Sequence, residues 1–158
     1  MKIILNKVIY PIAFGLLFSL GCSKKAIETC GLVNFSPVNW QYLQNYTIVD
    51  SKWEDKFLVI NSKQELDAQL IRNPQSSYIG FKDVDFNTST LLVGKKAISQ
   101  GAGELISQQV DRVCETDKYI YKVSVKNGGY TALTNFYFGV VVPKTGADAV
   151  KFEVSVTP

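Results

Sequence analysis

Three cysteines and the complete absence of histidine limit the chemistry available to this chain of 158 residues. Triad hydrolases need an imidazole that exchanges a proton near neutral pH, so this class of enzyme is excluded. The cysteines also lack the Cys-x-x-Cys spacing of zinc sites. Serines and lysines are numerous, but no spacing marks one pair of them as a catalytic dyad. We therefore expect a protein that is not an enzyme and that uses no cofactor or metal.

Cys22 closes an N-terminal segment with the composition of a secretory signal. Lys2 and Lys7 precede an uncharged run of 16 residues, 8–23, which is shorter than a membrane-spanning helix of roughly 20 residues. A basic start, an apolar stretch and a small residue before the cut, here Gly21, are typical of a signal peptide. We expect a signal peptidase to cut before Cys22, and acyl chains on this residue to anchor the mature protein to a membrane.

The segment resembles the signals of bacterial lipoproteins. The resemblance implies a signal peptide over residues 1–21. The length that remains is within the usual range of one domain, so we expect a tether and N-terminal extension over residues 22–45 and a single domain over residues 46–158. It also implies a location in the cell envelope, on the periplasmic face of a membrane or at the outer membrane. The alternative is an uncleaved hydrophobic anchor with an incidental cysteine, and in both cases the domain is tethered outside the cytoplasm.

Cys30 and Cys114 are the two thiols that remain once Cys22 is acylated. In an oxidising compartment two such thiols commonly pair. A Cys30–Cys114 disulfide would close a loop of about 85 residues, for which chain-entropy arguments give roughly 4 kcal/mol of stability. It would also fasten the tether to the domain. The alternative is two unrelated thiols, with Cys114 as a small buried side chain.

The charge of the chain gives little attraction for polyanions. The formal net charge is +3, and two of the lysines, Lys2 and Lys7, belong to the predicted signal peptide. Nucleic-acid binding depends on clustered cations, so we expect no nucleic-acid partner. The expected partners are the membrane, through the N-terminal lipid, and another exported protein.

Hydrophobic periodicity predicts one helix and a series of strands. Ser62 is an N-cap residue and Glu65 completes a capping box, which predicts a helix that ends at Asn73-Pro74. From Thr90 onward, apolar and polar residues alternate with period two. The predicted strands are 46–49, 57–60, 91–99, 104–114, 118–126, 135–142 and 150–156. We expect an α+β fold in which one helix packs on a curved antiparallel sheet of about six strands, as a partly closed barrel or a sandwich.

The order of these elements from residue 57 to residue 156 carries a second resemblance. A strand, the capped helix with Glu65-Leu66, the Asp85-Phe86 pair, a glycine-bearing turn and closing hairpins follow one another. This order resembles the C-terminal domain of the protease complex subunit family typified by the PrcB protein. That family has a glycine-glycine-aromatic turn, whereas Gly101-Ala102-Gly103 has no aromatic residue after it. The resemblance implies a non-catalytic partner of an exported, membrane-associated protease complex or similar assembly.

Alternating oxygen donors before the strand at residue 91 could suggest calcium binding. They are Asp83, Asp85, Asn87 and Ser89. An EF-hand is rejected because Thr88 and Gly94 stand where that loop needs its glycine and its glutamate. We expect Phe86 to enter the core and its polar neighbours to form a turn through hydrogen bonds to the backbone. The alternative is an irregular surface calcium site.

Two glycine-rich segments and one acidic segment are interpreted as turns and edges. Gly101 and Gly103 predict a hairpin turn rather than a phosphate loop, because a strand and not a helix follows them. The segment Asn127-Gly128-Gly129 predicts a tight reversal with positive φ. The carboxylates of Asp111, Glu115 and Asp117 are interpreted as a solvated strand edge and turn.

Aromatic side chains are the remaining candidates for a binding surface. Trp40, Tyr42 and Trp53 could stack on sugars or peptides, or could close one end of the core. Tyr130 lies at a turn, where an exposed ring often docks into a partner. The favoured function is a lipid-anchored, exported, non-catalytic interaction or accessory protein that holds another exported protein or complex through a sheet edge or the loops near Tyr130. The alternative is a glycan- or peptide-binding lipoprotein that uses the exposed aromatics.

Overall fold

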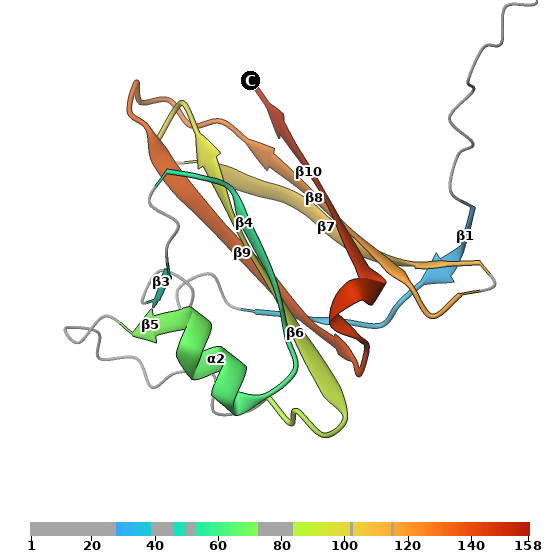
Figure 1. Ribbon diagram of the computed structural model, residues 1–158. Helices are drawn as coiled ribbons and strands as arrows, with labels where there is room; N and C mark the ends of the chain where they lie inside the picture. The colour runs from blue at the N-terminus through green and yellow to red at the C-terminus, as the bar shows by residue number, and fades with distance from the viewer. Residues whose placement is uncertain (1–27, 39–45, 50–52, 73–83, 102, 115) are drawn as a thin grey trace, which may run out of the picture.

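The computed structural model describes residues 28–38, 46–49, 53–72, 84–101, 103–114 and 116–158. Two four-stranded sheets lie face to face, and a two-stranded sheet together with the helix α2 (Lys63–Gln69) lies on the outer side of one of them (Figure 1). The described chain is therefore an α+β sandwich with one α-helix, as predicted, and its described strands do not close into a barrel.

The first sheet has the strand order β1-β7-β8-β10. Its strands are β1 (Thr29–Leu32), β7 (Glu104–Val113), β8 (Tyr119–Lys126) and β10 (Val150–Thr157). β10 pairs with β8 in parallel, which differs from the fully antiparallel sheet that we predicted. Alternation of side chains decides which face a residue occupies and carries no information on the direction of the neighbouring strand. The short 3-10 helix η1 (Ala147–Ala149) leads the chain into β10 beside the start of β8.

The second sheet has the strand order β2-β9-β6-β4, and all its pairings are antiparallel. Its strands are β2 (Ser36–Pro37), β9 (Thr134–Pro143), β6 (Ser89–Ile98) and β4 (Lys56–Ile60). The small sheet consists of β3 (Tyr46–Ile48) and β5 (Leu70–Arg72).

Two hydrophobic clusters lie on the two sides of the second sheet, because successive residues of its strands point to opposite faces. The cluster between the sheets is built from Leu92, Val110, Tyr121, Val123, Val125, Phe138, Val140 and Val142, with Tyr119, Phe136, Val150, Phe152 and Val154 among the side chains packed against it. The cluster on the side of α2 is built from Ile48, Ile60, Leu66, Leu70, Leu91 and Val93. The alternating apolar residues of β8, β9 and β10 all contribute to this first cluster, which agrees with the period-two pattern from Thr90 onward.

The connections after β6 and β8 cross between the sheets, so the predicted hairpin at Gly101 and Gly103 and the predicted reversal at Asn127-Gly128-Gly129 are wrong. β6 and β7 belong to different sheets, as do β8 and β9. The only described glycine with a positive φ is Gly31. Gly103 instead allows close packing, since a Cβ there would lie 2.6 Å from Cδ1 of Ile98 and 3.0 Å from the carbonyl oxygen of Lys126.

The helix α2 begins as predicted and ends earlier. The Ser62 hydroxyl accepts a hydrogen bond from the backbone N of Glu65 at 3.1 Å, and the Glu65 carboxylate accepts one from the backbone N of Asn61 at 2.7 Å. The helix stops at Gln69 rather than at Asn73-Pro74, because Leu70 starts β5 and buries its side chain.

The predicted turn at Asp85 is present. The Asp85 carboxylate accepts hydrogen bonds from the backbone N of Asn87 and from the hydroxyl of Thr88, both at 3.0 Å. Phe86 packs against the cluster on the side of α2. These bonds to neighbouring groups hold the Asp85 pKa below its ordinary value. The polar side chains therefore stabilise the turn that leads into β6.

Residues 28–38, which we had assigned to the tether and extension, take part in the sandwich. β1 pairs with β7 and β2 pairs with β9, so this segment crosses from the first sheet to the second. Cys30 and Cys114 form the predicted disulfide, with Cα atoms 5.0 Å apart, within the usual range. Cys22 and the predicted signal peptide lie outside the described residues. In the described ranges, no helix has the length and apolar character needed to cross a membrane.

Candidate functional site

The structure describes two of the four aromatic residues that were predicted as binding surfaces. Trp53 and Tyr130 are exposed, with relative accessibilities of 59% and 70%. Trp53 precedes β4, whose first residue pairs near the end of β6, and Tyr130 forms a bridge with Gly101 just after β6. Both therefore lie at the end of the sandwich where β6 ends and β7 begins, which we call the apical end. Trp40 and Tyr42 lie outside the described residues.

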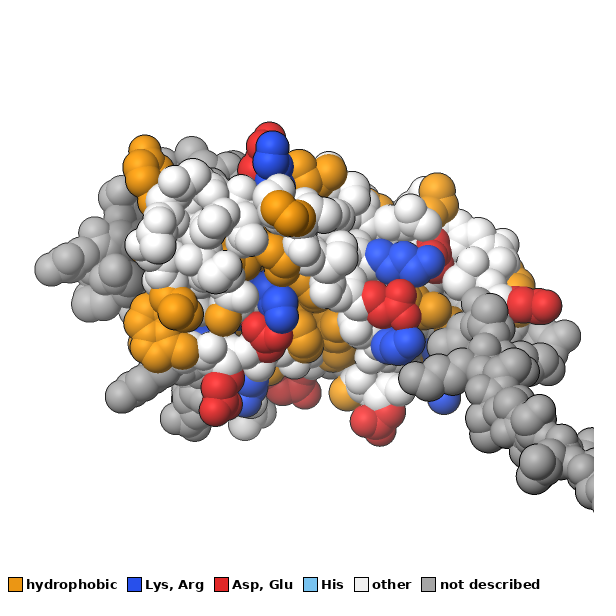
Figure 2. All heavy atoms as spheres, turned by 90° about the horizontal axis from the view of Figure 1, so that it is seen from above, with side chains coloured by type: hydrophobic (Ala, Val, Ile, Leu, Met, Phe, Trp, Pro, Cys, Tyr) orange, Lys and Arg blue, Asp and Glu red, His pale blue; other side chains and the backbone are white. Residues whose placement is uncertain are grey.

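Further large hydrophobic side chains are exposed at the apical end. Among the eight that are exposed in the described residues, five form what we call the apical patch: Trp53, Leu105, Ile106, Tyr130 and Leu133. Leu105 and Ile106 lie at the start of β7, and Leu133 directly precedes β9. Figure 2, which views the molecule from above Figure 1, shows hydrophobic side chains at several places between charged ones. Exposed apolar side chains gathered at one end of a domain are typical of a contact surface for another molecule.

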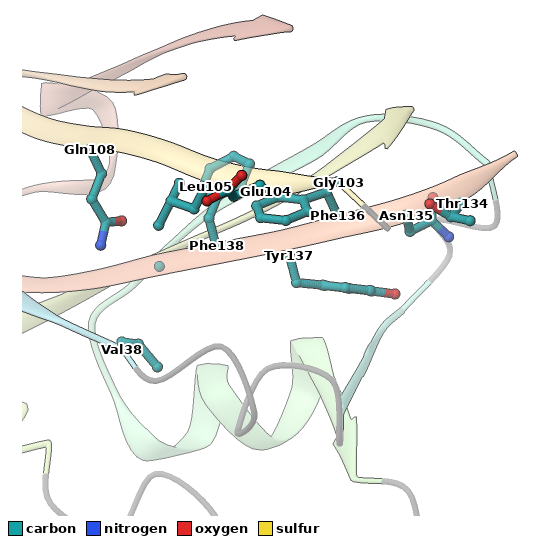
Figure 3. Close-up of a pocket in the computed structure, with 11 residues that line it drawn as sticks. Val38, Gly103, Glu104, Leu105, Gln108, Thr134, Asn135, Phe136, Tyr137 and Phe138 are labelled. Atoms are coloured by element: carbon teal, nitrogen blue, oxygen red, sulfur yellow. The ribbon is translucent and has the colours of Figure 1, made fainter. Parts of the chain in front are cut away.

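A cavity of about 550 Å³ opens between β7 and β9 beside the apical patch. We call it the β7–β9 groove, and it is lined by Val38, Gly103, Glu104, Leu105, Gln108 and residues 134–139. Phe136 and Phe138 point from β9 toward β7, whereas Tyr137 points to the other side of the strand, toward α2 (Figure 3). The groove therefore follows the edge of β9 and reaches the aromatic part of the core.

The groove results from the different ways in which the two long sides of the sandwich are closed. On one side, Phe57 of β4 stacks on Phe152 of β10 with ring centroids 5.2 Å apart. On the other side, residues 33–38 cross from β7 to β9 and are held at their two ends by backbone hydrogen bonds with N···O distances of 2.8 and 3.0 Å. Between this crossing and the apical end, no described strand covers the facing edges of β7 and β9.

A buried tyrosine orients the amide side chain that lines the groove. The hydroxyl of Tyr121 donates a hydrogen bond to Oε1 of Gln108 at 2.8 Å, and Tyr121 is fully buried. Burial raises the pKa of Tyr121 above its ordinary value, so the hydroxyl keeps its proton at neutral pH and remains a donor. Nε2 of Gln108 then remains as a donor with no partner among the described residues.

Among the described residues that line the groove, Glu104 is the one that is charged. In the described residues, no group of three His, Cys, Asp or Glu side chains gathers into a possible metal site. The groove thus combines aromatic rings, an amide donor, a carboxylate and strand backbone. These groups can bind an extended or apolar ligand, and none of them is arranged as a nucleophile beside a base.

Asp111 is buried, which corrects its interpretation as part of a solvated strand edge. Its relative accessibility is 3%, because Lys122 and Gln109 lie over it and each donates a hydrogen bond to its carboxylate at 2.6 Å. Burial alone would raise the pKa of Asp111, but the bonds from Lys122 and Gln109 outweigh it and the pKa lies below its ordinary value. Asp117 is exposed as expected and pairs with Arg112.

Lys95 is a buried charged residue that sequence reasoning missed. It lies in β6 with a relative accessibility of 1%. Burial lowers the pKa of Lys95 below its ordinary value, while Asp55 and Glu54 act in the opposite direction. No local pattern marks Lys95 as buried, since two adjacent lysines near the end of a predicted strand are typical of a solvated edge.

The groove itself was also not predicted. The alternation pattern correctly placed Phe136 and Phe138 on an inward face, and nothing marked Gln108 as special. A groove depends on which strands face each other across the sandwich, and this information is absent from the local pattern.

Comparisons of the chain with protein-family models, with curated proteins and with solved structures gave no match.

Proposed function

We propose that this chain is an exported, lipid-anchored, non-catalytic protein of the cell envelope, and that it binds another exported protein with its apical end. The observation that carries the proposal is the position of the apical patch at the end of the sandwich opposite the disulfide. The predicted lipid on Cys22 lies eight residues before Cys30, so the anchor belongs to the disulfide end.

The Cys30–Cys114 disulfide supports export, because structural disulfides form and persist in oxidising compartments. The disulfide would also set the direction in which the proposed lipid anchor holds the domain relative to the membrane. β7 is ten residues long, begins at the apical patch and ends beside the disulfide, and therefore spans roughly 30 Å at about 3.4 Å per residue. A lipid anchor at the disulfide end would therefore hold the apical patch away from the membrane surface, where another protein can reach it.

Site-specific photocrosslinking in cells tests the proposal. A photoreactive amino acid in place of Tyr130 should give one major adduct with an exported protein. The matched control is the same amino acid in place of Leu32, which is equally exposed, with a relative accessibility of 72%, and lies beside the disulfide. We expect no adduct at that position. Equal adducts at both positions, or none at Tyr130, would contradict the proposed contact surface.

The anchor is tested separately by metabolic labelling with a fatty acid. The full chain should incorporate the label and partition with membranes. Cys22→Ala should lose the label and shift the protein to the soluble fraction, while a Cys30→Ser control keeps the label. An unlabelled wild-type chain would contradict the lipid anchor without affecting the crosslinking result.

The alternative function, binding of a glycan or peptide through aromatic stacking, is favoured by one observation. Trp53 remains exposed on the surface rather than closing the core. A titration with a panel of glycans, followed through indole fluorescence, tests this alternative. A response that disappears in Trp53→Phe would favour it over protein binding at the apical patch.

A further inference from the structure

We propose that β10 is a self-association surface, at which it pairs in antiparallel direction with β10 of a second copy of the chain. This surface lies at the outer edge of the first sheet and not at the apical patch, so the proposal goes beyond the proposed function. The two proposals rest on different residues and can be tested apart.

β10 is the last strand of the first sheet, and half of its backbone groups point away from that sheet. The N–H and C=O groups of one strand residue point to the same edge, and the edges alternate along a strand. The carbonyl of Thr157 accepts a hydrogen bond from the backbone N of Asn127 at 2.8 Å, so Thr157 and every second residue before it face β8. No described strand pairs with the opposite edge. The residues that face this outer edge are Val150, Phe152, Val154 and Val156.

The inner side chains of β10 are less well covered than those of the neighbouring strand. Tyr121 and Val125 of β8 are buried, whereas Phe152 and Val154 of β10 keep part of their surface exposed. Phe57, which stacks on Phe152 from β4, has a relative accessibility of 37%. Apolar side chains that remain partly exposed along the outer edge of a sheet are typical of a contact surface.

β10 is regular, and most of the features that block an edge strand are absent from it. Proline, a bulge or an inward-pointing charge commonly prevents an edge from pairing. β10 contains no proline, and its eight residues pair with β8 without a shift in register. Lysine also often protects an edge, but Lys151 forms an ion pair with Glu153 at 2.6 Å. The strand therefore carries no net charge that would repel another copy.

Charge complementarity favours a second copy as the occupant and determines the register. Outer-edge residues must lie opposite one another in an antiparallel pair, so the twofold axis passes through a residue of each strand. An axis at Lys151 or at Glu153 would place two like charges opposite each other. Only an axis at Phe152 places Lys151 of each copy opposite Glu153 of the other, which gives two stabilising pairs. β10 is thus complementary to itself, as a twofold interface requires.

Phe152 would lie at the centre of this interface, opposite the same residue of the second copy. The two rings would meet on the inner face of the joined sheet, next to the Phe57 rings on which they already stack. Aromatic pairs across neighbouring strands stabilise a sheet. The exposed parts of these rings would therefore become less accessible to water in the dimer.

Antiparallel pairing affects how the proposed lipid anchors reach a membrane. The strands of the two copies would run in opposite directions, so the disulfide ends would lie at opposite ends of the dimer. Seven residues, 23–29, separate Cys22 from Cys30, and they span about 25 Å when extended. Both lipids would therefore reach one membrane if the joined sheet lies along its surface. The two apical patches would then point along the membrane in opposite directions.

Sedimentation velocity of the full chain in detergent micelles, at several protein concentrations, measures the dimer. Lys151→Glu and Glu153→Lys should each weaken it about tenfold or more, because both opposite-charge pairs become like-charge pairs. The double variant Lys151→Glu, Glu153→Lys should return to within about threefold of wild type, since it rebuilds the pairs with exchanged signs. Lys126→Glu makes the same charge change on β8, away from the outer edge, and should stay within about twofold of wild type.

Cysteine crosslinking in membranes tests the register. Lys151→Cys chains mixed with Glu153→Cys chains should form a disulfide between copies on mild oxidation. Directly opposite residues that do not exchange hydrogen bonds have Cα atoms about 4.5 Å apart, which a disulfide can span. Lys151→Cys mixed with Ser155→Cys is the matched control and should give much less product, because these positions are opposite only when the axis passes through Glu153.

Three results would overturn the proposal: a wild-type chain that stays monomeric at every concentration, a dimer that neither charge reversal weakens, or a stronger crosslink for the control pair of positions. A wild-type monomer whose position 151 crosslinks to a different protein would also overturn it, and would assign the edge to that protein. If the dimer forms but Tyr130 gives no adduct, self-association stands and the proposed function fails. If the adduct forms and the dimer is absent, the reverse holds.

Discussion

Removal of the Cys30–Cys114 disulfide gives the sharpest test of how this fold is stabilised. Cys30 is exposed and Cys114 is partly buried, so the double variant Cys30→Ser, Cys114→Ser loses little buried apolar surface. The loss of stability should therefore arise almost entirely from the larger conformational freedom of the unfolded chain.

The expected magnitude depends on the sequence separation of the two cysteines, which is 84 residues. The loop-closure relation gives roughly 4.5 kcal/mol at 25 °C for a loop of this length. For a domain of about 130 residues, 1 kcal/mol shifts the melting temperature by about 4 °C. We expect the melting temperature to fall by roughly 18 °C.

Urea and thermal unfolding of the full chain in a mild detergent, followed by circular dichroism, measure the effect. The denatured state should also expose more surface without the crosslink, so the dependence of the free energy of unfolding on urea should become steeper. Reduction of the wild-type protein with a thiol reagent provides a control that changes no side chain other than the two cysteines. It should reproduce the shift of the double variant.

A loss of less than about 1 kcal/mol would refute this reasoning, because it falls far below the range expected for long loops. Such a result would mean that residues 28–38 are held by β1 and β2 pairing alone, or that the unfolded chain remains compact. Hydrogen exchange at the amides of β1 would distinguish these explanations, since only a detached β1 exchanges rapidly.

Three smaller perturbations test single contacts. Gly94→Ala would place a Cβ only 2.2 Å from Cε2 of Phe138, which is buried, and should destabilise the fold by about 1–3 kcal/mol in urea unfolding. Asp111→Asn removes a carboxylate whose pKa is lowered in the folded state, so its stabilising effect is present above pH 3.8 and is lost as the pH falls through the folded pKa. Wild type and variant should therefore differ by about 1–3 kcal/mol at neutral pH and converge under acid conditions. Ser62→Ala removes the N-cap of α2 and should lower the free energy of unfolding by about 1 kcal/mol.

Matched substitutions control for these effects. Gly129→Ala meets no atom within 4 Å and should be nearly neutral, so an equal loss in both glycine variants would contradict the packing argument. Asp117→Asn removes an exposed carboxylate and should change the free energy of unfolding little at neutral pH. If Asp111→Asn changes it as little at neutral pH, the buried hydrogen bonds carry no net stability. Gln64→Ala, within the exposed part of α2, should change less than Ser62→Ala.

The features that sequence reasoning predicted correctly are local ones. The N-cap of α2 depends on residues three positions apart, and the turn at Asp85 depends on neighbours within three positions. The inward faces of β8 and β9 follow from alternation within single strands. Such features are determined by nearby residues, so a single sequence contains the information needed to predict them.

The features that it missed depend on partners distant in the sequence. Period-two alternation is the same for a hairpin and for a strand that crosses to the opposite sheet, so Gly103 was assigned to the wrong kind of turn. The burial of Asp111 depends on Lys122, which lies on the neighbouring strand β8. Only the pairing register of β7 and β8 shows that these two residues are close. The groove likewise requires knowledge that β7 faces β9. Tyr130 was predicted as exposed from its position at a turn, and this is confirmed. For Trp53 the sequence left open whether the ring closes the core or lies on the surface, and the structure places it on the surface.

The disulfide and the groove are parts of one arrangement. The disulfide fastens β1 to the end of β7, and this fixes where residues 33–38 begin their crossing to β9. The crossing ends at Val38, which lines the groove at the end farther from the apical end. Residues 33–38 therefore cover one part of the side between β7 and β9, and the disulfide holds this part at the end nearest the predicted anchor. The groove occupies the other part of this side, at the apical end. In the proposed function, a force between a bound partner and the membrane would pass along β7 and through the disulfide, rather than through the non-covalent pairing of β1 and β2 alone.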